Sequence, residues 1–471
     1  MAIALTIALG LAGCSADPGP ARDGVSAKTS AAVPDRGSGG RDTASAPRGE
    51  PALPDDFNGD GIRDLAIGDT GAGAGGVAEA GAVAVLTGFG AGAGAVSPSR
   101  LTWNDSGTEA RPQDWFGSVM TSADFNGDGY ADLAVAAIGR DEPSDEDVGG
   151  VTVTMGGPSG LTASAPAARL DIPAERRTHK GSLMASGDVD ADGFPDLIVG
   201  DSTWTFHVVH GGPTFPAGAQ AWPFDLGEER GDLVVADVTG DKVADVVTLL
   251  GDRVEVRAGG REGLAVPVVT PLDRRGRGYQ VHRITVGDVD TDGKPDIVVS
   301  GLRGPDAGKY YRGEITVFHG GSVRRTVLDG KTPGMEPFKT RPTGFARMST
   351  AVTDIDGDHD TDLVVTLPDS DAFLLVRSGR GGLTPSTGTL AGGGRNESRT
   401  VKLIDLDGDG RTELVTSGQV TGKVTVSTWS KGWKSSLELG PGENGLSGTA
   451  PEKAVEEPVW VFFSSWLTFT V

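Results

Sequence analysis

The chain has 471 residues, of which 37% are apolar and 74 are glycine, so it can bury a core but must turn often. Its 65 acidic residues outnumber its 42 basic residues and give a net charge of −23, which excludes nucleic acid as the expected partner, because binding to phosphates needs a basic surface. A single cysteine excludes a disulfide framework.

Residues 1–14 form a short apolar stretch that ends in Leu11-Ala12-Gly13-Cys14. This box is similar to a bacterial lipoprotein signal, and the resemblance implies that Cys14 receives a diacylglycerol and becomes the first mature residue. No Lys or Arg precedes the apolar run, so an ordinary cleaved signal peptide is the alternative. Both interpretations predict an extracytoplasmic protein, which is anchored to the cell membrane by lipid in the first case and secreted in the second.

Residues 15–50 are rich in Ser, Ala, Gly, Pro and Asp and show no hydrophobic periodicity. A segment of this composition cannot bury enough apolar surface to fold. We therefore predict a disordered linker that separates a folded domain from its anchor.

An acidic motif organises the rest of the chain. Its first copy reads Asp56-Phe57-Asn58-Gly59-Asp60-Gly61-Ile62-Arg63-Asp64, and an apolar run follows it at once. Six later copies begin at Asp124, Asp188, Asp237, Asp288, Asp354 and Asp405, so successive starts are 68, 64, 49, 51, 66 and 51 residues apart. These intervals suit the four-stranded blades of a β-propeller.

The segments between the motifs have the pattern of β-strands. A β-branched run follows each motif, and in several copies an alternating segment ending in Gly-Gly comes next, at 151–157, 206–212, 254–260 and 315–321. One blade cannot bury both of its faces, whereas seven arranged radially cover one another. We therefore expect residues 51–471 to form an all-β, seven-bladed β-propeller, with the closing strand supplied by Val459–Val471.

The acidic motif has the chemistry of a calcium-binding loop. Oxygen ligands at positions 1, 3, 5 and 9 suit a hard dication, and glycine at position 6 permits the positive φ of a sharp turn. The predicted ligand sets, in chain order, are Asp56, Asn58, Asp60 and Asp64; Asp124, Asn126, Asp128 and Asp132; Asp188, Asp190, Asp192 and Asp196; Asp237, Asp241 and Asp245; Asp288, Asp290, Asp292 and Asp296; Asp354, Asp356, Asp358 and Asp362; and Asp405, Asp407, Asp409 and Glu413.

Up to seven Ca²⁺ sites follow from these sets, and the copies differ in strength. The fourth has Thr239 and Lys242 at positions 3 and 6, so the site at Asp237 is the one expected to be empty, and the sixth has His359 in place of glycine. Position 12 is β-branched in every copy, whereas an EF-hand carries Glu there and continues as a helix. Asp-Gly turns without any metal are the alternative interpretation.

These repeats resemble the FG-GAP repeat family, which includes the seven-bladed propeller of integrin α subunits and many bacterial surface proteins. The resemblance covers roughly residues 51–430, and its most specific element is the DxDxDGxxD loop, which implies calcium on one face of the propeller and partners on the other. Phe116-Gly117 matches the family's Phe-Gly, while Lys180-Gly181 and Phe345-Ala346 depart from it, and no Gly-Ala-Pro occurs. An integrin-like ligand therefore does not follow from the resemblance.

No GxSxG, HExxH or Walker motif is present, so we predict that the chain is not an enzyme. His210 and His319 stand directly before a Gly-Gly pair, where other repeats have Met155 or Ala258, and we interpret them as framework residues. Six aromatic residues between the motifs are expected to pack between blades more readily than to line a sugar-binding surface: Trp103, Trp115, Trp204, Trp222, Tyr310 and Tyr311.

The expected function is that of a calcium-stabilised surface binding or adhesion module. Its partner would be a protein or glycan at the cell surface, it would touch the membrane only through the lipid anchor, and it would be a monomer. The alternatives are a carbohydrate-binding lectin of the same fold and a polysaccharide-active enzyme that uses the propeller as its framework.

Overall fold

The computed structural model describes residues 51–89, 96–142, 146–173, 177–225, 231–250, 253–272, 279–303, 312–335, 350–355, 360–366, 372–378, 383–389, 399–418, 424–429, 433–439 and 467–469. The predicted signal with Cys14, the predicted linker, and Asp356, Asp358 and His359 of the sixth motif lie outside these residues, and so do Tyr310 and Tyr311.

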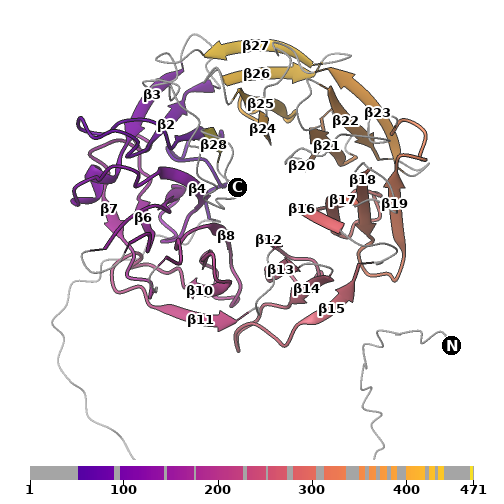
Figure 1. Cartoon of the computed structure of the whole chain (residues 1–471), viewed down its shortest axis with the longest axis horizontal. Helices are drawn as coiled ribbons and strands as arrows, with labels where there is room; N and C mark the ends of the chain where they lie inside the picture. Colours follow the sequence, from indigo (N-terminus) through magenta and orange to yellow (C-terminus); the bar gives the residue numbers. More distant parts are fainter. Residues whose placement is uncertain are drawn as a thin grey trace, which may run out of the picture. The chain divides into compact units, whose positions relative to one another are not determined.

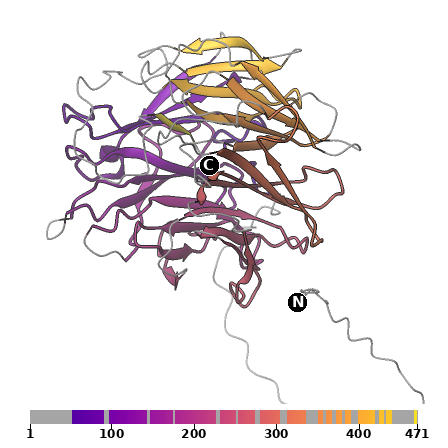
Figure 2. The same ribbon diagram turned by 45° about the vertical axis from the view of Figure 1, so that its right-hand side comes forward.

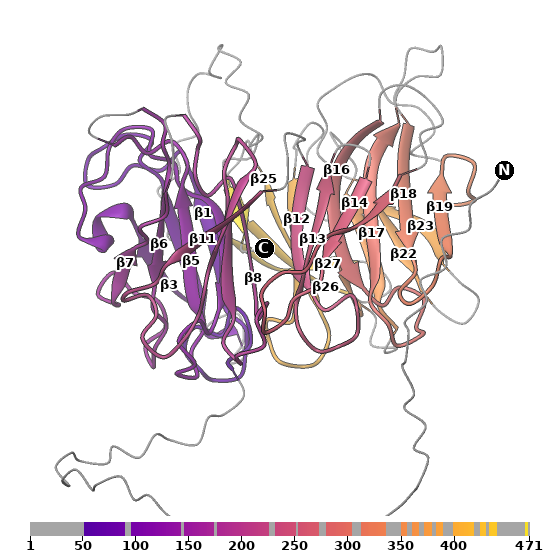
Figure 3. The same ribbon diagram turned by 90° about the horizontal axis from the view of Figure 1, so that it is seen from below.

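Within the unit Arg48–Val471, the described strands form seven four-stranded antiparallel sheets arranged in a ring (Figure 1). The predicted all-β, seven-bladed propeller is thereby confirmed. In the edge-on view, inner strands such as β12 and β16 run along the axis of the ring (Figure 3).

From the centre outwards, the strands are β28 (Leu467–Phe469), β1 (Leu65–Asp69), β2 (Ala82–Thr87) and β3 (Ser97–Leu101) in blade 1; β4 (Phe116–Ala123), β5 (Asp132–Ala137), β6 (Gly150–Thr154) and β7 (Ala167–Arg169) in blade 2; β8 (Leu183–Gly187), β9 (Asp196–Gly200), β10 (Thr205–Val209) and β11 (Ala221–Asp225) in blade 3; and β12 (Gly231–Ala236), β13 (Asp245–Leu250), β14 (Arg253–Arg257) and β15 (Val268–Pro271) in blade 4.

They continue with β16 (Tyr279–Gly287), β17 (Asp296–Arg303), β18 (Arg312–Phe318) and β19 (Arg325–Asp329) in blade 5; β20 (Thr350–Thr353), β21 (Asp362–Thr366), β22 (Ala372–Arg377) and β23 (Thr384–Thr389) in blade 6; and β24 (Arg399–Ile404), β25 (Glu413–Gly418), β26 (Val424–Trp429) and β27 (Trp433–Leu439) in blade 7. A short 3₁₀ helix, η3, covers Trp103–Ser106.

The ring closes through blade 1, which takes its innermost strand from the end of the chain. Gly68 of β1 pairs with Thr468 of β28, flanked by the pairs Ile67 with Phe469 and Asp69 with Leu467. Blade 7 then lies beside blade 1 (Figure 2). The expectation of a closing strand near the C-terminus is confirmed for Leu467–Phe469.

The core is divided among the junctions between blades. Seven clusters of buried apolar side chains occur in the described residues, and each joins two neighbouring blades. In β13, Val247 and Leu249 pack toward blade 5, whereas Val246 and Leu250 pack toward blade 3. Because successive residues of a strand face opposite sides, a strand buried on both faces must be apolar at nearly every position.

The Phe-Gly pair marks a close contact between blades 1 and 2. Gly81 forms a parallel bridge with Phe116, and a Cβ on Gly81 would lie 2.2 Å from the Phe116 carbonyl oxygen. Gly149 bridges Lys180 in the same way at the next junction, where a Cβ would lie 2.4 Å from the Lys180 nitrogen. Lys180-Gly181 thus takes the structural place of Phe-Gly, which explains why the departure from the family pattern leaves the fold intact.

The tryptophans divide between packing and exposure. Trp103 and Trp204 are buried, and Trp103 meets Phe116 edge-on with ring centroids 5.9 Å apart. Trp115 packs against the core between blades 2 and 3. Trp222 in the outer strand β11 is 57% exposed, so the expectation of packing is wrong for this residue.

Candidate metal centre

Each acidic loop, defined as the nine residues of one motif and numbered 1 to 7 along the chain, comes directly before the second strand of a blade. Because the strand order repeats in all seven blades, the loops lie at the same end of the blades. Adjacent loops also touch: the Ala131 N–H donates to the Asp56 carbonyl at 2.9 Å, and the Ala244 N–H donates to the Asp188 carbonyl at 2.9 Å. Every loop leads into a strand, as predicted, and none has the helical setting of an EF-hand.

The carboxylate at position 9 is buried in all seven loops: Asp64, Asp132, Asp196, Asp245, Asp296, Asp362 and Glu413. In loops 1 to 5 and in loop 7, one of its oxygens accepts a hydrogen bond from the backbone N–H of position 2, as from Phe125 to Asp132 at 3.1 Å and from Val189 to Asp196 at 2.9 Å. In loops 2 to 5 the other oxygen accepts from the first glycine of the pair after the third strand, as from Gly211 to Asp196 at 3.0 Å. Position 9 therefore anchors its loop to the blade through hydrogen bonds that do not need a metal.

The glycine pairs are explained by close contact with the loops. The first glycine of each pair faces the position 8 carbonyl of its own loop, and a Cβ on Gly156 would lie 2.3 Å from the Ala131 oxygen. In blades 2, 3 and 4 the second donates its N–H to the previous loop, as Gly157 does to the Phe57 carbonyl at 3.0 Å. The Gly-Gly pairs in these blades thus mark turns that contact both the acidic loop of their own blade and that of the previous blade.

Positions 1, 3 and 5 are held by the backbone of the loop itself. In loop 1, the Asp56 carboxylate accepts hydrogen bonds from the Asp60 N–H at 3.1 Å and the Gly61 N–H at 2.9 Å. Asn58 accepts from Asp60 at 2.9 Å, and Asp60 accepts from Ile62 at 2.9 Å. Loops 2, 3 and 7 repeat these local bonds at all three positions. The side-chain oxygens are therefore directed toward the inside of a tight turn.

The turn needs left-handed backbone at positions 4 and 6. Glycine takes this conformation at position 6 in loop 1, with φ of 83° at Gly61. Loop 4 keeps it without glycine, because Lys242 has φ of 72°. Ala191 and Thr291, at position 4 of loops 3 and 5, are also left-handed with φ of 60°, which is uncommon for residues with a side chain.

Carboxylate oxygens converge in three of the loops. Asp188, Asp190 and Asp192 of loop 3 each bring one oxygen within 4.8 Å of the others, as do Asp288, Asp290 and Asp292 of loop 5 and Asp405, Asp407 and Glu413 of loop 7. Loops 1 and 2 share the same backbone hydrogen bonds and carry the amide oxygens of Asn58 and Asn126 at position 3. These acidic groups could hold a metal ion.

Loop 4 differs from this pattern, and loop 6 lies only partly within the described residues. In loop 4, the Asp237 carboxylate accepts hydrogen bonds from Gly240 at 2.6 Å and from Lys242 at 2.7 Å, so the turn forms although Thr239 offers no carboxylate. In loop 6, the described residues include Asp354 and the buried Asp362. Loop 4 thus keeps the turn although it has lost the ligand at position 3.

The buried carboxylates of Asp64, Asp132 and Glu413, at position 9 of loops 1, 2 and 7, are hard to ionise without a compensating cation. Burial, with a contribution from the neighbouring carboxylates, raises the pKa of Asp64 from 3.8 to about 8 and that of Asp132 from 3.8 to about 8. The same causes raise the pKa of Glu413 from 4.5 to about 7. A dication favours the ionised form of a carboxylate, so it would offset the cost of burying these charges.

Two histidines that we interpreted as framework residues instead face the acidic loops. The imidazole of His210 contacts Asp190 and Asp196, and that of His319 contacts Asp290 and Asp296. Strand register explains these contacts. Val209 pairs with Leu197 and Phe318 with Ile297, so the residue after each strand, a histidine, lies opposite position 9 of the loop. Sequence spacing alone does not give that register.

Two segments of the chain match models of one protein family. Residues 116–153 match the FG-GAP repeat, and residues 354–416 match the FG-GAP-like repeat. With the seven blades, these matches support an FG-GAP β-propeller. The first matched segment begins at Phe116, where the Phe-Gly contact joins blades 1 and 2.

Curated relatives of the propeller are phosphatidylinositol-glycan-specific phospholipases D. The protein from Bos taurus is 26% identical over 223 residues, which are 45% of this chain and 21% of that protein. Those from Mus musculus and Homo sapiens are 40% and 35% identical over 91 and 95 residues, 18% of this chain in each case and 10% and 11% of those proteins. The chain thus spans about a fifth or less of the length of these relatives.

Solved structures with similar folds include a lectin from Agrocybe aegerita that recognises non-reducing terminal N-acetylglucosamine. It has a TM-score of 0.49 and 16% identity, over 79% of this chain and 90% of that one. The Photorhabdus luminescens Tc holotoxin pore has a TM-score of 0.38 and 16% identity, over 76% of this chain and 16% of that one. Neither likeness bears on the ligand of this propeller.

Helices that could cross a membrane were sought among the described residues, and none is both long enough and apolar enough.

Proposed function

We propose that this chain is a calcium-stabilised extracellular β-propeller that acts as a surface binding or adhesion module. The observation that supports it best is the convergence of carboxylate oxygens in loops 3, 5 and 7, on turns whose backbone already holds those oxygens in place. Calcium suits such loops because it accepts six to eight oxygen ligands in flexible geometry, whereas Mg²⁺ demands near-ideal octahedral geometry.

The proposed role of calcium is structural. Loops 2 to 7 join the first strand of a blade to its second, and adjacent loops contact each other through backbone hydrogen bonds, as loops 1 and 2 do. A cation that neutralises clustered carboxylates at this place would hold the inner ends of the blades together, and it would bind only to the folded chain. Recognition of a partner then falls to other surfaces of the propeller.

An extracellular location is supported by the FG-GAP repeats, which are typical of extracellular proteins. Membrane attachment through Cys14 is proposed from the Leu-Ala-Gly-Cys box. Replacing Cys14 by Ser is expected to release the protein from the membrane fraction and to abolish incorporation of radiolabelled fatty acid. If the variant stays membrane-bound and labelled, the lipid anchor at this residue is wrong.

We further propose that the propeller binds its partner without chemical turnover, as a monomer. The phospholipase activity in the name of the curated relatives belongs to proteins of which this chain matches about a fifth or less. A lectin remains the second candidate, because the partner of a surface module can be a glycan as well as a protein.

The partner is tested with the full chain carrying a biotin, in calcium and in chelator. Capture of a surface protein by the calcium-loaded form supports the adhesion module, and retention on a glycan array with no released product supports the lectin. Oligosaccharides released from polysaccharide, or phosphatidic acid released from a phosphatidylinositol-glycan, would overturn the proposal that the chain is not an enzyme.

A further inference from the structure

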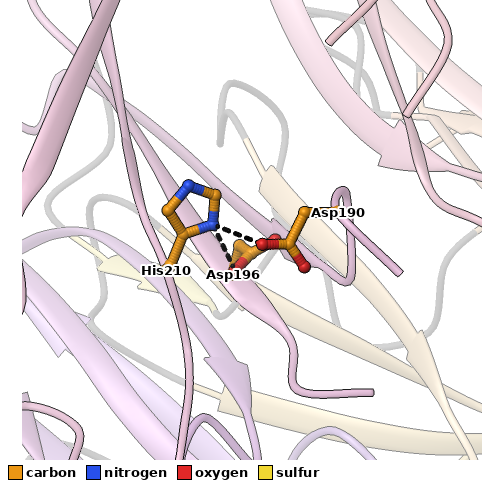
Figure 4. Close-up of side chains that lie close together, drawn as sticks. All are labelled: Asp190, Asp196 and His210. Carbon is orange, nitrogen blue, oxygen red and sulfur yellow. Dashed lines mark hydrogen bonds and ion pairs between the residues drawn. The ribbon is translucent and has the colours of Figure 1, made fainter. Parts of the chain in front are cut away.

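Loop 3 carries a nitrogen ligand beside its carboxylates. The Nδ1 atom of His210 lies 3.1 Å from Asp190 Oδ2 and 3.1 Å from Asp196 Oδ1, at positions 3 and 9 of the loop (Figure 4). The three side chains come from two elements, the acidic loop and the segment after β10, and their polar atoms point toward one another. Asp196 is fully buried, so the three side chains are held in place by the fold and are not a chance cluster of surface charges.

Loop 5 repeats the arrangement. The Nδ1 atom of His319 lies 2.7 Å from Asp290 Oδ2 and 3.7 Å from Asp296 Oδ1. The His319 side chain is 3% exposed, and its Nε2 lies 2.8 Å from the hydroxyl of Thr326, which fixes the orientation of the ring. Asp290 Oδ1 is buried and has no hydrogen-bond partner among the described residues. A buried carboxylate oxygen without a partner is costly, and a cation is the ligand that would satisfy it.

The separations between these atoms are close to those around a single small cation. Zinc binds imidazole nitrogen and carboxylate oxygen at about 2.0–2.2 Å, so neighbouring ligand atoms on one zinc ion are about 3.3–3.6 Å apart at tetrahedral angles. The nitrogen–oxygen distances of 3.1 Å in loop 3 are slightly shorter than that range, as expected of groups that hydrogen-bond when no metal separates them, and those of 2.7 and 3.7 Å in loop 5 lie on either side of it, so zinc would need only small movements of these side chains. Calcium, by contrast, prefers oxygen ligands at 2.3–2.6 Å and gains little from imidazole.

Blade 5 also has a competing cation. The guanidinium of Arg324 forms an ion pair with Asp290, and its Nη2 lies 3.0 Å from His319 Nδ1. The Arg324 side chain is 61% exposed, so it can turn into solvent when a metal binds. We therefore expect loop 3 to bind more tightly than loop 5, because loop 5 must displace the arginine.

We propose that loops 3 and 5 are mixed nitrogen–oxygen sites that bind a first-row transition-metal dication of the zinc class, through His210 with Asp190 and Asp196 and through His319 with Asp290 and Asp296. In these two loops zinc would displace the calcium that the proposed function places there, and the other loops keep calcium. Blades 2 and 4 have Met155 and Ala258 at the histidine position, so the nitrogen ligand distinguishes two loops from their neighbours. This inference rests on the proposed metal-binding role of the loops.

The test uses the full chain, freed of metal by chelator and then saturated with Ca²⁺. Zn²⁺ is titrated by calorimetry into wild type, into His210→Gln, into His319→Gln and into the double variant. The matched control is His179→Gln, which removes a half-buried imidazole whose Nδ1 contacts the Ile138 carbonyl instead of an acidic loop. Circular dichroism confirms that each variant is folded.

Wild type and the control are expected to bind one Zn²⁺ per mixed loop. Each single variant should lose one site or weaken it at least about 10-fold, and the double variant should lose both while its Ca²⁺ stoichiometry is unchanged. Cu²⁺ in place of Zn²⁺ gives a direct readout, because pulsed EPR detects the remote nitrogen of a coordinated imidazole. That signal should fall in the double variant and persist in the control.

Equal Zn²⁺ affinity in wild type and double variant, or an unchanged imidazole signal, would overturn the mixed sites. The proposed function is tested separately by the Ca²⁺ stoichiometry. That stoichiometry includes loops 1, 2 and 7, which have no histidine in the motif. Calcium binding without a histidine-dependent zinc site refutes only the inference, and absence of calcium binding refutes the calcium-stabilised propeller.

Discussion

The carboxylate of Asp132 accepts a 2.9 Å hydrogen bond from the backbone N–H of Gly156, 24 residues further along the chain. This bond ties the end of an acidic loop to the turn after the third strand of blade 2. It brings the glycine so close to the loop that a side chain has no room.

Gly156→Ala is expected to destabilise the propeller, because its Cβ would lie 2.3 Å from the Ala131 carbonyl oxygen. Overpacking against backbone costs about 1–3 kcal/mol, so the urea midpoint should fall at unchanged slope. Gly157→Ala is the matched control, since a Cβ there would meet nothing within 4 Å, and its effect should stay within about 0.5 kcal/mol. Equal effects of the two substitutions would contradict this explanation of the glycine pair.

The blades and their loops could be predicted from the sequence because both are local patterns. An acidic motif, a β-branched run and a glycine pair recur in order, and the structure places the glycine pair against the loop of its own blade. Position 9 was harder to interpret: Asp196 is a predicted metal ligand, and its two oxygens also accept backbone hydrogen bonds, a structural role that the motif does not reveal.

The contacts of the histidines could not be predicted from the sequence. His210 lies 14 residues after Asp196, and only the pairing of Val209 with Leu197 brings the two side chains together. Its neighbours at the same repeat position, such as Met155, are ordinary packing residues, so comparison of repeats favours a framework role. Register between strands depends on the turn that joins them, and the spacing of motifs does not encode it.

Calcium is expected to raise the melting temperature of the full chain, and chelator to lower it. A cation that binds only the folded state contributes about 2.7 kcal/mol per site at 100 times its Kd. Differential scanning calorimetry in Ca²⁺ and in EDTA measures the effect. Equal melting temperatures would refute the stabilising role.

The fourth loop supplies an internal comparison for that calcium effect. Asp128 and Asp241 occupy position 5 of loops 2 and 4, and each accepts a backbone hydrogen bond two residues on, from Tyr130 at 3.1 Å and from Val243 at 3.0 Å. Asparagine preserves that bond, so neither variant should change the metal-free protein by more than about 0.5 kcal/mol. Asp128→Asn should reduce the stabilisation by calcium, whereas Asp241→Asn should leave it unchanged. A loss of calcium stabilisation in the Asp241 variant would show that loop 4 binds.

The pH dependence of stability has a separate contribution from Asp69, which lies at the end of β1 and outside the acidic loops. Burial raises the pKa of Asp69 from 3.8 to about 6. The folded state therefore holds the proton more tightly than the unfolded state, so stability falls as pH rises from about 4 to about 6 and the penalty is complete above that range.

Asp69→Asn removes that penalty and keeps an acceptor for the Gly71 N–H, which lies 3.0 Å from Asp69 Oδ1. The variant should be more stable than wild type at pH 7.5, by at most about 3 kcal/mol, and the gain should disappear near pH 4. Chemical denaturation at both pH values gives the difference. A gain that is independent of pH would mean that the charge of Asp69 is not its source.

Closure of the ring depends on three residues of β28, and a pair of truncations isolates them. Removal of residues 467–471 deletes the partners of Ile67, Gly68 and Asp69 and leaves the inner edge of β1 without hydrogen bonds. Removal of residues 470–471 alone keeps all three pairs. Cross-strand pairs contribute about 0.2–1 kcal/mol each, so the longer truncation should cost about 1–3 kcal/mol and expose blade 1 to protease, while the shorter one should behave as wild type. If both truncations resist protease equally, packing between blades 7 and 1 closes the ring without the strand.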